Sequence, residues 1–395
     1  MGRTDRAARA LRRIPGARVV GPHARRVAPL HRVRPSRRPE SAGLDRGPRA
    51  RRGPAARLGR RRADHRPAGC GGAAVPIPTL TDVVEARARV RQRLPPTPLL
   101  RHPLLNAETG LDIRVKHENH NPTGAFKIRG GINLIAGLSP EERRRGVVTA
   151  STGNHGQSIA LACRDEGIAC TVVVPAGNNP EKNAAMRALG AEVLEHGRDF
   201  DEAREHVEAL QRAQPRRYVH SANEPLLIAG VGTYALEIFE AQPETDVIIV
   251  PIGGGSGACG CAVVRSGLGS RARIVGVQAA RADAFARSWL GRCRIAGDAA
   301  DTFAEGIATR VTFDLTFGIL RRELDAVVTL GEAELQDGVR LALRATHNLA
   351  EGAGAASLAA AVKLRDTLAG KRVVCVMSGG NIDTATLRRI LAPPA

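Results

Sequence analysis

A lysine in a glycine-rich turn is the first residue of this sequence that could do chemistry. Lys127 lies in the segment 121–131 (NPTGAFKIRGG), and the chain has only five lysines beside its many arginines. Unlike arginine, a lysine can lose its proton and form a Schiff base with a carbonyl compound. The turn residues precede a helical pattern, which puts Lys127 at a helix start, where the helix dipole favours the free amine. The alternative is an ordinary lysine in solvent.

Two further segments join an apolar strand-like run to a helical run through glycine. The segment 253–257 (GGGSG) offers backbone amides and a helix N-terminus to a phosphate, although a purely structural tight turn is the alternative. The segment 376–381 (VMSGGN) places the Ser378 hydroxyl where it could contact a bound heterocycle, and a helix N-cap is the alternative there. Together with Lys127, these segments predict pyridoxal phosphate as the cofactor.

The segment 151–157 (STGNHGQ) follows the same strand, turn and helix pattern. Its hydroxyls, amides and helix N-terminus suit a carboxylate, and an N-cap by Ser151 or Thr152 is the alternative. His155 could act as a general base, but a histidine at a helix start more often makes a structural hydrogen bond. We therefore predict a substrate carboxylate site here.

Strand-like and helical runs alternate along the rest of the chain, which predicts an α/β protein with parallel sheets and helices on both faces. The first helix is expected at 81–94, with Thr81 or Asp82 as its N-cap. The expected strands are 113–116, 147–150, 170–174, 191–194, 247–250, 274–277, 326–330 and 373–377. The other expected helices are 126–137, 154–166, 180–189, 201–213, 224–241, 257–268, 332–346, 353–368 and 382–391.

Eight strands exceed what one compact unit needs, so we predict two domains. Residues 145–222 form the small domain as an insertion, and residues 75–144 with 223–395 form the large one. A ligand is expected in the cleft between them, at the carboxyl ends of the strands. The segments 221–225 and 305–309 are expected to shape that pocket.

The net charge of +20 belongs almost entirely to the N-terminal segment. Residues 1–66 hold 21 arginines and four acidic residues, which leaves the remainder of the chain nearly neutral. Residues 1–74 show no apolar period, so we expect a disordered tail or a segment foreign to the functional protein. A transit peptide and a nucleic-acid-binding arm are the alternatives.

Cysteine usage and hydropathy indicate a cytoplasmic protein. Seven scattered cysteines form no CxxC pair, and Cys259 and Cys261 lack zinc-knuckle spacing. No run of about 18 apolar residues occurs, so no membrane span is expected.

From residue 76 to 395 the chain resembles the fold-type II pyridoxal-phosphate enzymes, whose architecture is that of the tryptophan synthase beta chain. Within them the motifs 121–131 and 151–157 are similar to those of the threonine/serine dehydratase and serine racemase branch. Ile128 fits this branch, since threonine and cysteine synthases usually have Asp there. The resemblance implies a homodimer acting on a small amino acid, without membrane or nucleic-acid partners.

The resemblance also implies roles for individual residues. Lys127 would be the Schiff-base lysine, Phe126 would pack on the cofactor ring, and Glu351 would lie beneath it. Ser378 would face the pyridine nitrogen, and Asn154 the phenolic ring oxygen. The phosphate loop would comprise Gly253, Gly254, Gly255, Ser256 and Gly257. The substrate carboxylate would be held by Ser151, Thr152, Gly153, Asn154 and His155.

The implied activity is conversion of L-threonine or L-serine to a 2-oxoacid and ammonia, with Lys127 removing the α-proton. Thr152 occupies the place of the second acid/base of serine racemases, so racemisation is one alternative. The other is a 3-hydroxyaspartate ammonia-lyase, in which Arg204 would meet the second carboxylate. No metal is expected, because Asp283 is the only acidic residue in the region of the family's metal site. No residues remain for a regulatory domain, so inhibition by isoleucine is not expected.

Overall fold

The computed structural model describes residues 75–392 except residue 214, and it contains two sheets. The six-stranded sheet runs β1 (Leu99–Arg101), β2 (Asp112–His117), β10 (Arg372–Met377), β7 (Val247–Pro251), β8 (Arg273–Ala279) and β9 (Ala326–Leu330). The four-stranded sheet runs β5 (Glu192–Glu195), β4 (Cys170–Val174), β3 (Val147–Ala150) and β6 (Arg217–Tyr218). All neighbours are parallel except β1 and β2.

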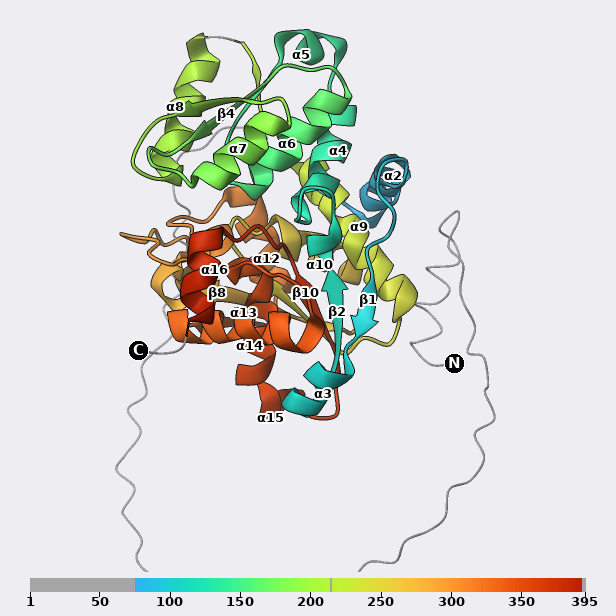
Figure 1. Cartoon of the computed structure of the whole chain (residues 1–395). Coiled ribbons are helices and arrows are strands. Elements are labelled where there is room, and N and C mark those ends of the chain that lie inside the picture. Colours follow the sequence, from blue (N-terminus) through green and yellow to red (C-terminus); the bar gives the residue numbers. More distant parts are fainter. Residues whose placement is uncertain (1–74, 214, 393–395) are drawn as a thin grey trace, which may run out of the picture. The chain divides into compact units, whose positions relative to one another are not determined.

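Helices lie between the strands in the order that the sequence predicts (Figure 1). The helices before β7 are α2 (Leu80–Arg91), α3 (Pro103–Thr109), α4 (Lys127–Ala136), α5 (Pro140–Arg145), α6 (Asn154–Asp165), α7 (Pro180–Ala188), α8 (Phe200–Ala213) and α9 (Pro225–Ala241). Those after β7 are α10 (Ser256–Gly267), α11 (Ala284–Gly291), α12 (Asp314–Glu323), α13 (Glu332–Thr346), α14 (Gly352–Lys363), α15 (Arg365–Leu368) and α16 (Thr384–Leu391). Short 3₁₀ turns are η1 (Glu118–His120), η2 (Ala280–Ala282) and η3 (Glu305–Ile307).

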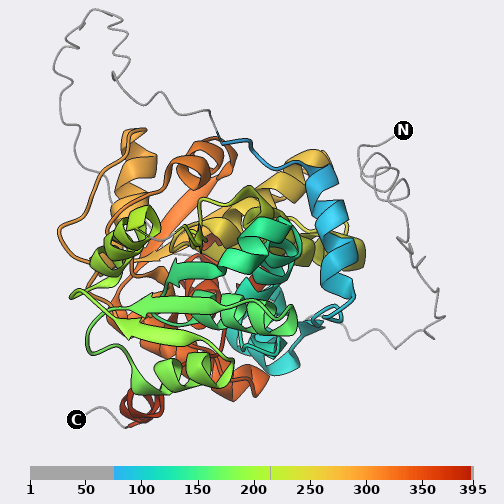
Figure 2. The ribbon, with the colours of Figure 1, turned by 90° about the horizontal axis from the view of Figure 1, so that it is seen from above.

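The elements of the two sheets form separate groups in space. In Figure 1, β4 and the helices α6, α7 and α8 lie together, apart from β2, β8 and β10. Seen along the perpendicular direction, the strands of the small sheet run side by side as green arrows (Figure 2). The α/β class is confirmed, while the domain bounds at 145 and 222 stay a prediction.

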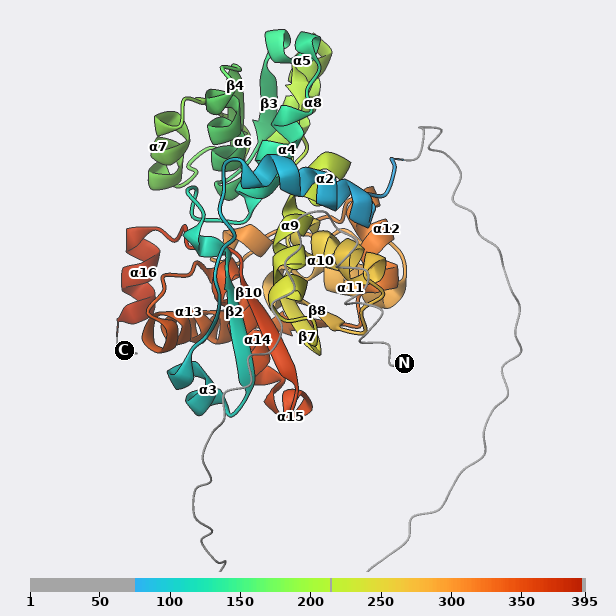
Figure 3. The same ribbon diagram turned by 90° about the vertical axis from the view of Figure 1, so that its right-hand side faces the viewer.

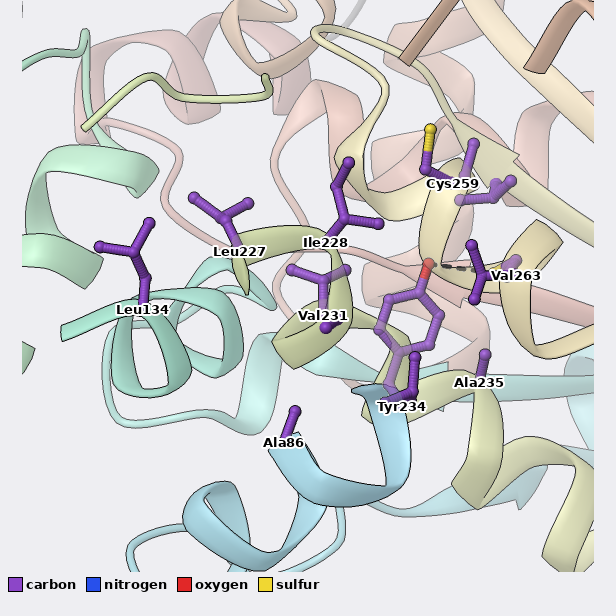
Figure 4. Packing of buried hydrophobic residues seen from close by; sticks show 14 of the residues in the cluster. Ala86, Leu134, Leu227, Ile228, Val231, Tyr234, Ala235, Cys259 and Val263 are labelled. Carbon is purple, nitrogen blue, oxygen red and sulfur yellow. Dashed lines mark hydrogen bonds between the residues drawn. The ribbon is translucent and has the colours of Figure 1, made fainter. Parts of the chain in front are cut away.

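Helix α9 is the centre of the main core. Its sequence is apolar almost all round, and 13 of its 17 residues are buried, which is typical of an internal helix. It packs against α2, α4 and α10, and Figure 3 shows α2 lying beside α4 and α9. In Figure 4 the ring of Tyr234 lies among Val231, Ala235 and Val263 from α9 and α10. This packing fixes α4 and α10, whose N-termini carry two of the predicted motifs.

Every expected strand and helix is observed, with small shifts at the ends. The N-cap of α2 is Thr79, and neither Thr81 nor Asp82 fills that place, because Asp82 is instead the third helical residue of a capping box. The helix expected at 353–368 is interrupted at Leu364. The sequence analysis missed β1, β6, α3, α5, α11 and α12. The prediction for residues 1–74 lies outside the described residues.

In the described part of the chain, no helix combines the length and hydropathy that a membrane crossing needs.

Candidate active site

The predicted motifs meet in one cleft at the carboxyl ends of β2, β3, β7 and β10. The loops after these strands come together there, as expected for parallel sheets. The cleft contains all of the predicted site residues: Phe126, Lys127, Ser151, Thr152, Gly153, Asn154, His155, Gly253, Gly254, Gly255, Ser256, Gly257, Glu351 and Ser378. Ser221 and the segment 305–309 line it too, as expected.

Lys127 begins α4, and its side chain points to the glycine-rich loop. Its Nζ donates to Ser256 Oγ at 2.9 Å and to the Ser221 carbonyl oxygen at 3.1 Å. Loss of surrounding water lowers the pKa of Lys127 to about 8, because the charged form is the better hydrated one. The lysine is therefore not an ordinary solvated side chain, and its amine loses its proton far more readily than that of a lysine in water.

The lysine turn is joined to the loop after β10. The Phe126 amide donates to the Ser378 carbonyl oxygen at 3.0 Å, and Ala125 forms a bridge with Gly379. The Phe126 ring centroid lies 5.2 Å from Lys127 Nζ. Ser378 is not an N-cap, since α16 begins later and is capped by Asp383. Two segments about 250 residues apart in sequence thus form one wall of the cleft.

The segment 253–257 forms a close-fitting turn at the start of α10. Gly255 has φ of 93°, a left-handed conformation that favours glycine. A Cβ on Gly253 would lie 2.3 Å from the Gly306 carbonyl oxygen, so a side chain there has no room. No side chain caps α10, and its first amides lack partners within the helix, so they can bind an anion in the cleft.

The loop 151–155 places a second helix N-terminus in the cleft. Gly153, and neither Ser151 nor Thr152, is the N-cap of α6, and it provides no side-chain cap. Ser151 Oγ accepts from the amides of Gly153 at 3.0 Å and Gly156 at 2.8 Å, which holds the turn from within. The remaining amides at this helix start can bind a carboxylate.

His155 makes a structural hydrogen bond. Its Nε2 lies 2.9 Å from Thr149 Oγ1, whose hydroxyl donates to the Val219 carbonyl oxygen at 2.7 Å. Nε2 must then be the donor, which leaves Nδ1 unprotonated. Burial, and to a smaller extent the nearby Lys127, lower the pKa of His155 well below its ordinary value. A neutral, buried imidazole fits the structural role better than that of a general base.

Asn154 is held by polar partners on both sides. Its Nδ2 donates to Glu351 Oε1 at 2.6 Å, and its Oδ1 accepts from Asn381 Nδ2 at 2.8 Å. Burial raises the pKa of Glu351, and the Lys182 charge and the Asn154 bond partly oppose that rise. The Asn154 amide is therefore fixed in orientation at the floor of the cleft.

The sequence analysis missed a buried ion network behind the lysine turn. Arg129 Nε donates to Glu118 Oε2 at 2.7 Å and its Nη1 to Glu237 Oε1 at 2.7 Å, while Lys116 Nζ lies 2.5 Å from Glu237 Oε2. Two cations thus balance two carboxylates inside the protein. The network ties β2, α4 and α9 together beneath Lys127. Charged residues within apolar elements, Arg129 in α4 and Glu237 in α9, were the available signals.

Comparisons with known proteins agree with this geometry. The model of the family described as "Pyridoxal-phosphate dependent enzyme" matches residues 90–379. The chain belongs to this family.

Three similar proteins illustrate the relationship. The L-threonine ammonia-lyase of Thermotoga maritima is 40% identical over 315 residues, which cover 79% of this chain and 78% of the relative. The processed form of threonine deaminase isoform 2 from Solanum lycopersicum has a TM-score of 0.75 at 27% identity, covering 82% of this chain and 92% of that one. Maize serine racemase has a TM-score of 0.75 at 28% identity, covering 80% of this chain and 97% of that one.

The cleft fits the cofactor of the family on its own residues. The Lys127 amine, with its lowered pKa, can react with the cofactor aldehyde. The start of α10 has no side-chain cap and is preceded by glycines, so its amides can bind the cofactor phosphate. Phe126 and Ser378 line the same cleft. The residues that the sequence predicts for the cofactor site of this pyridoxal-phosphate enzyme therefore lie together in one cleft.

The region of the family's metal site, where the sequence predicts no metal, holds structural contacts. Gln278 accepts from the Ala286 amide at 2.8 Å, and Asp283 pairs with Arg287 at 2.9 Å. Among the described residues, no group of three or more His, Cys, Asp or Glu side chains could hold a metal ion.

Proposed function

We propose that this protein is an ammonia-lyase that converts L-threonine, L-serine or both to the corresponding 2-oxoacid and ammonia. The observation that carries the proposal is the position of Lys127. Its amine, of lowered pKa, lies in one cleft with two helix N-termini that offer backbone amides, one suited to a phosphate and one to a carboxylate. The similarity to L-threonine ammonia-lyase supports the choice of reaction.

The cofactor, when bound, supplies an electron-withdrawing ring that acidifies the α-hydrogen of an attached amino acid. The protein must then supply a base. Lys127 Nζ is the candidate, since its free amine can accept that proton within the cleft. The pKa of about 8 keeps the base close to the working pH, where general bases are most effective.

The start of α6 orients the substrate in this proposal. The amides of Asn154 and His155 bind the α-carboxylate, whereas the Gly153 amide donates to the Ser151 hydroxyl, which keeps the turn in shape. Thr152 and Asn154 complete the carboxylate site. Gly153 and His155 act through their backbone amides and take no part in acid/base chemistry. A fixed carboxylate holds the α-hydrogen in one orientation, which contributes to the rate.

The segment 253–257 binds the cofactor phosphate, and Ser378 faces the ring nitrogen in this proposal. A neutral hydroxyl stabilises a protonated ring less than a carboxylate would. This favours loss of the β-hydroxyl over reactions that need a long-lived carbanion. Glu351 acts through Asn154, whose amide it orients.

The proposal is tested by incubating the purified holoenzyme with L-threonine, L-serine and their D-isomers. We expect 2-oxobutyrate or pyruvate with one equivalent of ammonia from the L-isomers. A protein that binds the cofactor yet releases no 2-oxoacid from either L-isomer would overturn the proposal.

A racemase is the second candidate, because Thr152 places a hydroxyl-bearing residue in the cleft together with Lys127. The similarity to maize serine racemase also supports this activity. Chiral analysis of the unreacted amino acid in the same incubation distinguishes the two activities. Accumulation of D-serine faster than pyruvate would favour the racemase.

We also propose that the protein is a cytoplasmic homodimer with the domain bounds predicted from the sequence. Light scattering on the purified protein tests the dimer.

A further inference from the structure

An ion pair crosses the cleft between the two groups of elements. Lys182 is in α7, which follows β4 of the small sheet, and Glu305 is in η3, which lies between β8 and β9 of the large sheet. Lys182 Nζ lies 2.5 Å from Glu305 Oε2. Both residues line the cleft that contains Lys127.

Lys182 lies directly against the proposed carboxylate loop. A Cβ built on Gly153 would be 3.0 Å from Lys182 Cδ, so the lysine stem covers the start of α6. The Lys182 side chain is 10% exposed, whereas that of Glu305 is 35% exposed. A cation this buried requires a partner, and Glu305 provides it.

The charges in the cleft divide into two sets. Among the described residues that line it, the lysine and acidic side chains are Lys127, Lys182, Glu305 and Glu351. Lys127 and Glu351 belong to the cofactor site described above. Lys182 and Glu305 remain for the substrate, and as a pair they carry no net charge.

Arg204, the residue expected to meet a second substrate carboxylate, is engaged elsewhere. It lies 2.5 Å from Glu208, 3.4 Å from Glu205 and 3.8 Å from Asp201, all on its own helix α8. It is not among the residues that line the cleft. Apart from Lys127, Lys182 is therefore the lysine that lines the cleft beside the carboxylate loop, and its ammonium is already paired with Glu305.

We infer that the Lys182–Glu305 pair determines the substrate class, admitting hydroxy amino acids with uncharged side chains and excluding those with a second carboxylate. Glu305 repels such a carboxylate and competes with it for the Lys182 ammonium. The pair acts mainly by repelling a second carboxylate, since to the uncharged side chains of threonine and serine it presents a surface without net charge. This inference rests on the proposed function of the cleft.

The direct test replaces Glu305 by its uncharged isostere. In the Glu305→Gln holoenzyme, the ratio of kcat/KM for 3-hydroxyaspartate to that for L-threonine should rise by about tenfold or more, since the ammonium is then free for a carboxylate. The change should appear mainly as a lower KM for 3-hydroxyaspartate. A purely structural role for Glu305 would instead lower turnover of both substrates alike.

The matched variant is Lys182→Gln, which leaves the Glu305 carboxylate unpaired. The same ratio should fall below that of the wild type, and Lys182→Gln/Glu305→Gln should lie between the two single variants. Visible absorbance of the bound cofactor verifies that each variant is folded and loaded. An equal ratio in the wild type and both single variants would refute the inference, as would a wild type that prefers 3-hydroxyaspartate.

A binding measurement separates failure of this inference from failure of the proposed lyase activity. L-Aspartate and L-2-aminobutyrate lack the leaving hydroxyl, and their binding can be titrated through the cofactor absorbance. Glu305→Gln should strengthen the binding of L-aspartate relative to that of L-2-aminobutyrate, even if the wild type showed no lyase activity. Unchanged relative affinities would contradict the inference while leaving the lyase proposal standing.

Discussion

Lys127 combines two properties that rarely coincide in a lysine. It begins a helix, where the dipole opposes its charge, and its neighbours in the cleft are a hydroxyl and a carbonyl group rather than carboxylates. Lys182 in the same cleft shows the contrast. Burial alone would lower the pKa of Lys182, but Glu351 and Glu305 raise it above its ordinary value. The two lysines are thus suited to different tasks, one to exchange a proton and one to remain charged.

Replacing Lys127 by alanine should abolish both cofactor attachment and catalysis. We expect the visible absorbance of the purified protein to disappear and lyase activity to fall by about 10³-fold or more. Borohydride reduction followed by peptide mapping should label the wild type at this residue. Lys371→Ala, at an exposed lysine, is the control and should retain colour and activity. Label on another lysine would exclude Lys127 as the attachment site.

The pKa of Lys127 predicts how cofactor capture depends on pH. Only the free amine attacks an aldehyde, and it becomes the major form above the folded-state pKa of about 8. The rate at which apoprotein takes up pyridoxal phosphate should therefore rise about tenfold per pH unit up to that value and level off above it. Stopped-flow absorbance measures this rate. A rise that continues to about pH 10 would mean an ordinary lysine.

The chemistry of single residues was more predictable than their partners. The placement of Lys127 and Ser378 at one cleft followed from local sequence, because strand, glycine turn and helix signals lie within a few residues, whereas the role expected of Asn154 came from the family resemblance. The sequence could not show that Asn154 meets Glu351 or that Lys182 meets Glu305. Those contacts depend on how distant segments pack, which local patterns do not encode.

At the scale of elements, the glycine turn before α10 should tolerate no side chain. Gly253→Ala places a Cβ against a backbone oxygen that cannot move aside, so the loop must shift. We expect cofactor affinity to fall by about tenfold or more. Titration of apoprotein with pyridoxal phosphate measures it.

Gly318→Ala is the matched control for that change. Gly318 lies in α12, and a Cβ there meets nothing within 4 Å. This replacement should leave cofactor affinity unchanged and stabilise the helix by up to about 1 kcal/mol. Equal affinity in both variants would mean that the turn does not bind the phosphate.

The buried ion network should contribute strongly once one partner is removed. Arg129→Met leaves two buried carboxylates with Lys116 alone, so the free energy of unfolding should fall by about 3–5 kcal/mol. Urea denaturation followed by circular dichroism measures the loss. Arg344→Met breaks an exposed pair with Glu108 and should lower the free energy of unfolding far less, because solvent screens exposed ion pairs. Similar losses of unfolding free energy in both variants would show that the buried network stabilises the protein no more than an exposed ion pair does.

Apolar periods that extend over several residues predicted most helices and strands, whereas the shortest strands were not predicted. The strands β3, β4 and β9 have the predicted bounds because β-branched residues dominate them. β1 and β6 have three and two residues, too few for any period to appear. The missed α5 had a readable signal, since Ser139, Pro140 and Glu142 form a capping box with proline at the helix start.

At the scale of the whole molecule, we expect the site to need both sheets but not the arginine-rich segment. The first described helix carries its own capping box at Thr79 and Asp82, so it can begin without earlier residues. A chain lacking residues 1–74 should keep full lyase activity and cofactor absorbance, as a steady-state assay can verify. Loss of activity in the shortened chain would mean that the segment takes part in folding or assembly.

The position of β10 has a consequence for biosynthesis. This strand is the last of the described strands in sequence, yet it lies between β2 and β7 and carries Ser378 at its end. Until β10 has been synthesised, no strand connects β2 to β7, and the large sheet stays divided at this point. The cleft can therefore close only after residues 372–378 have been synthesised, and a polypeptide that ends before them would leave two open sheet edges prone to aggregation.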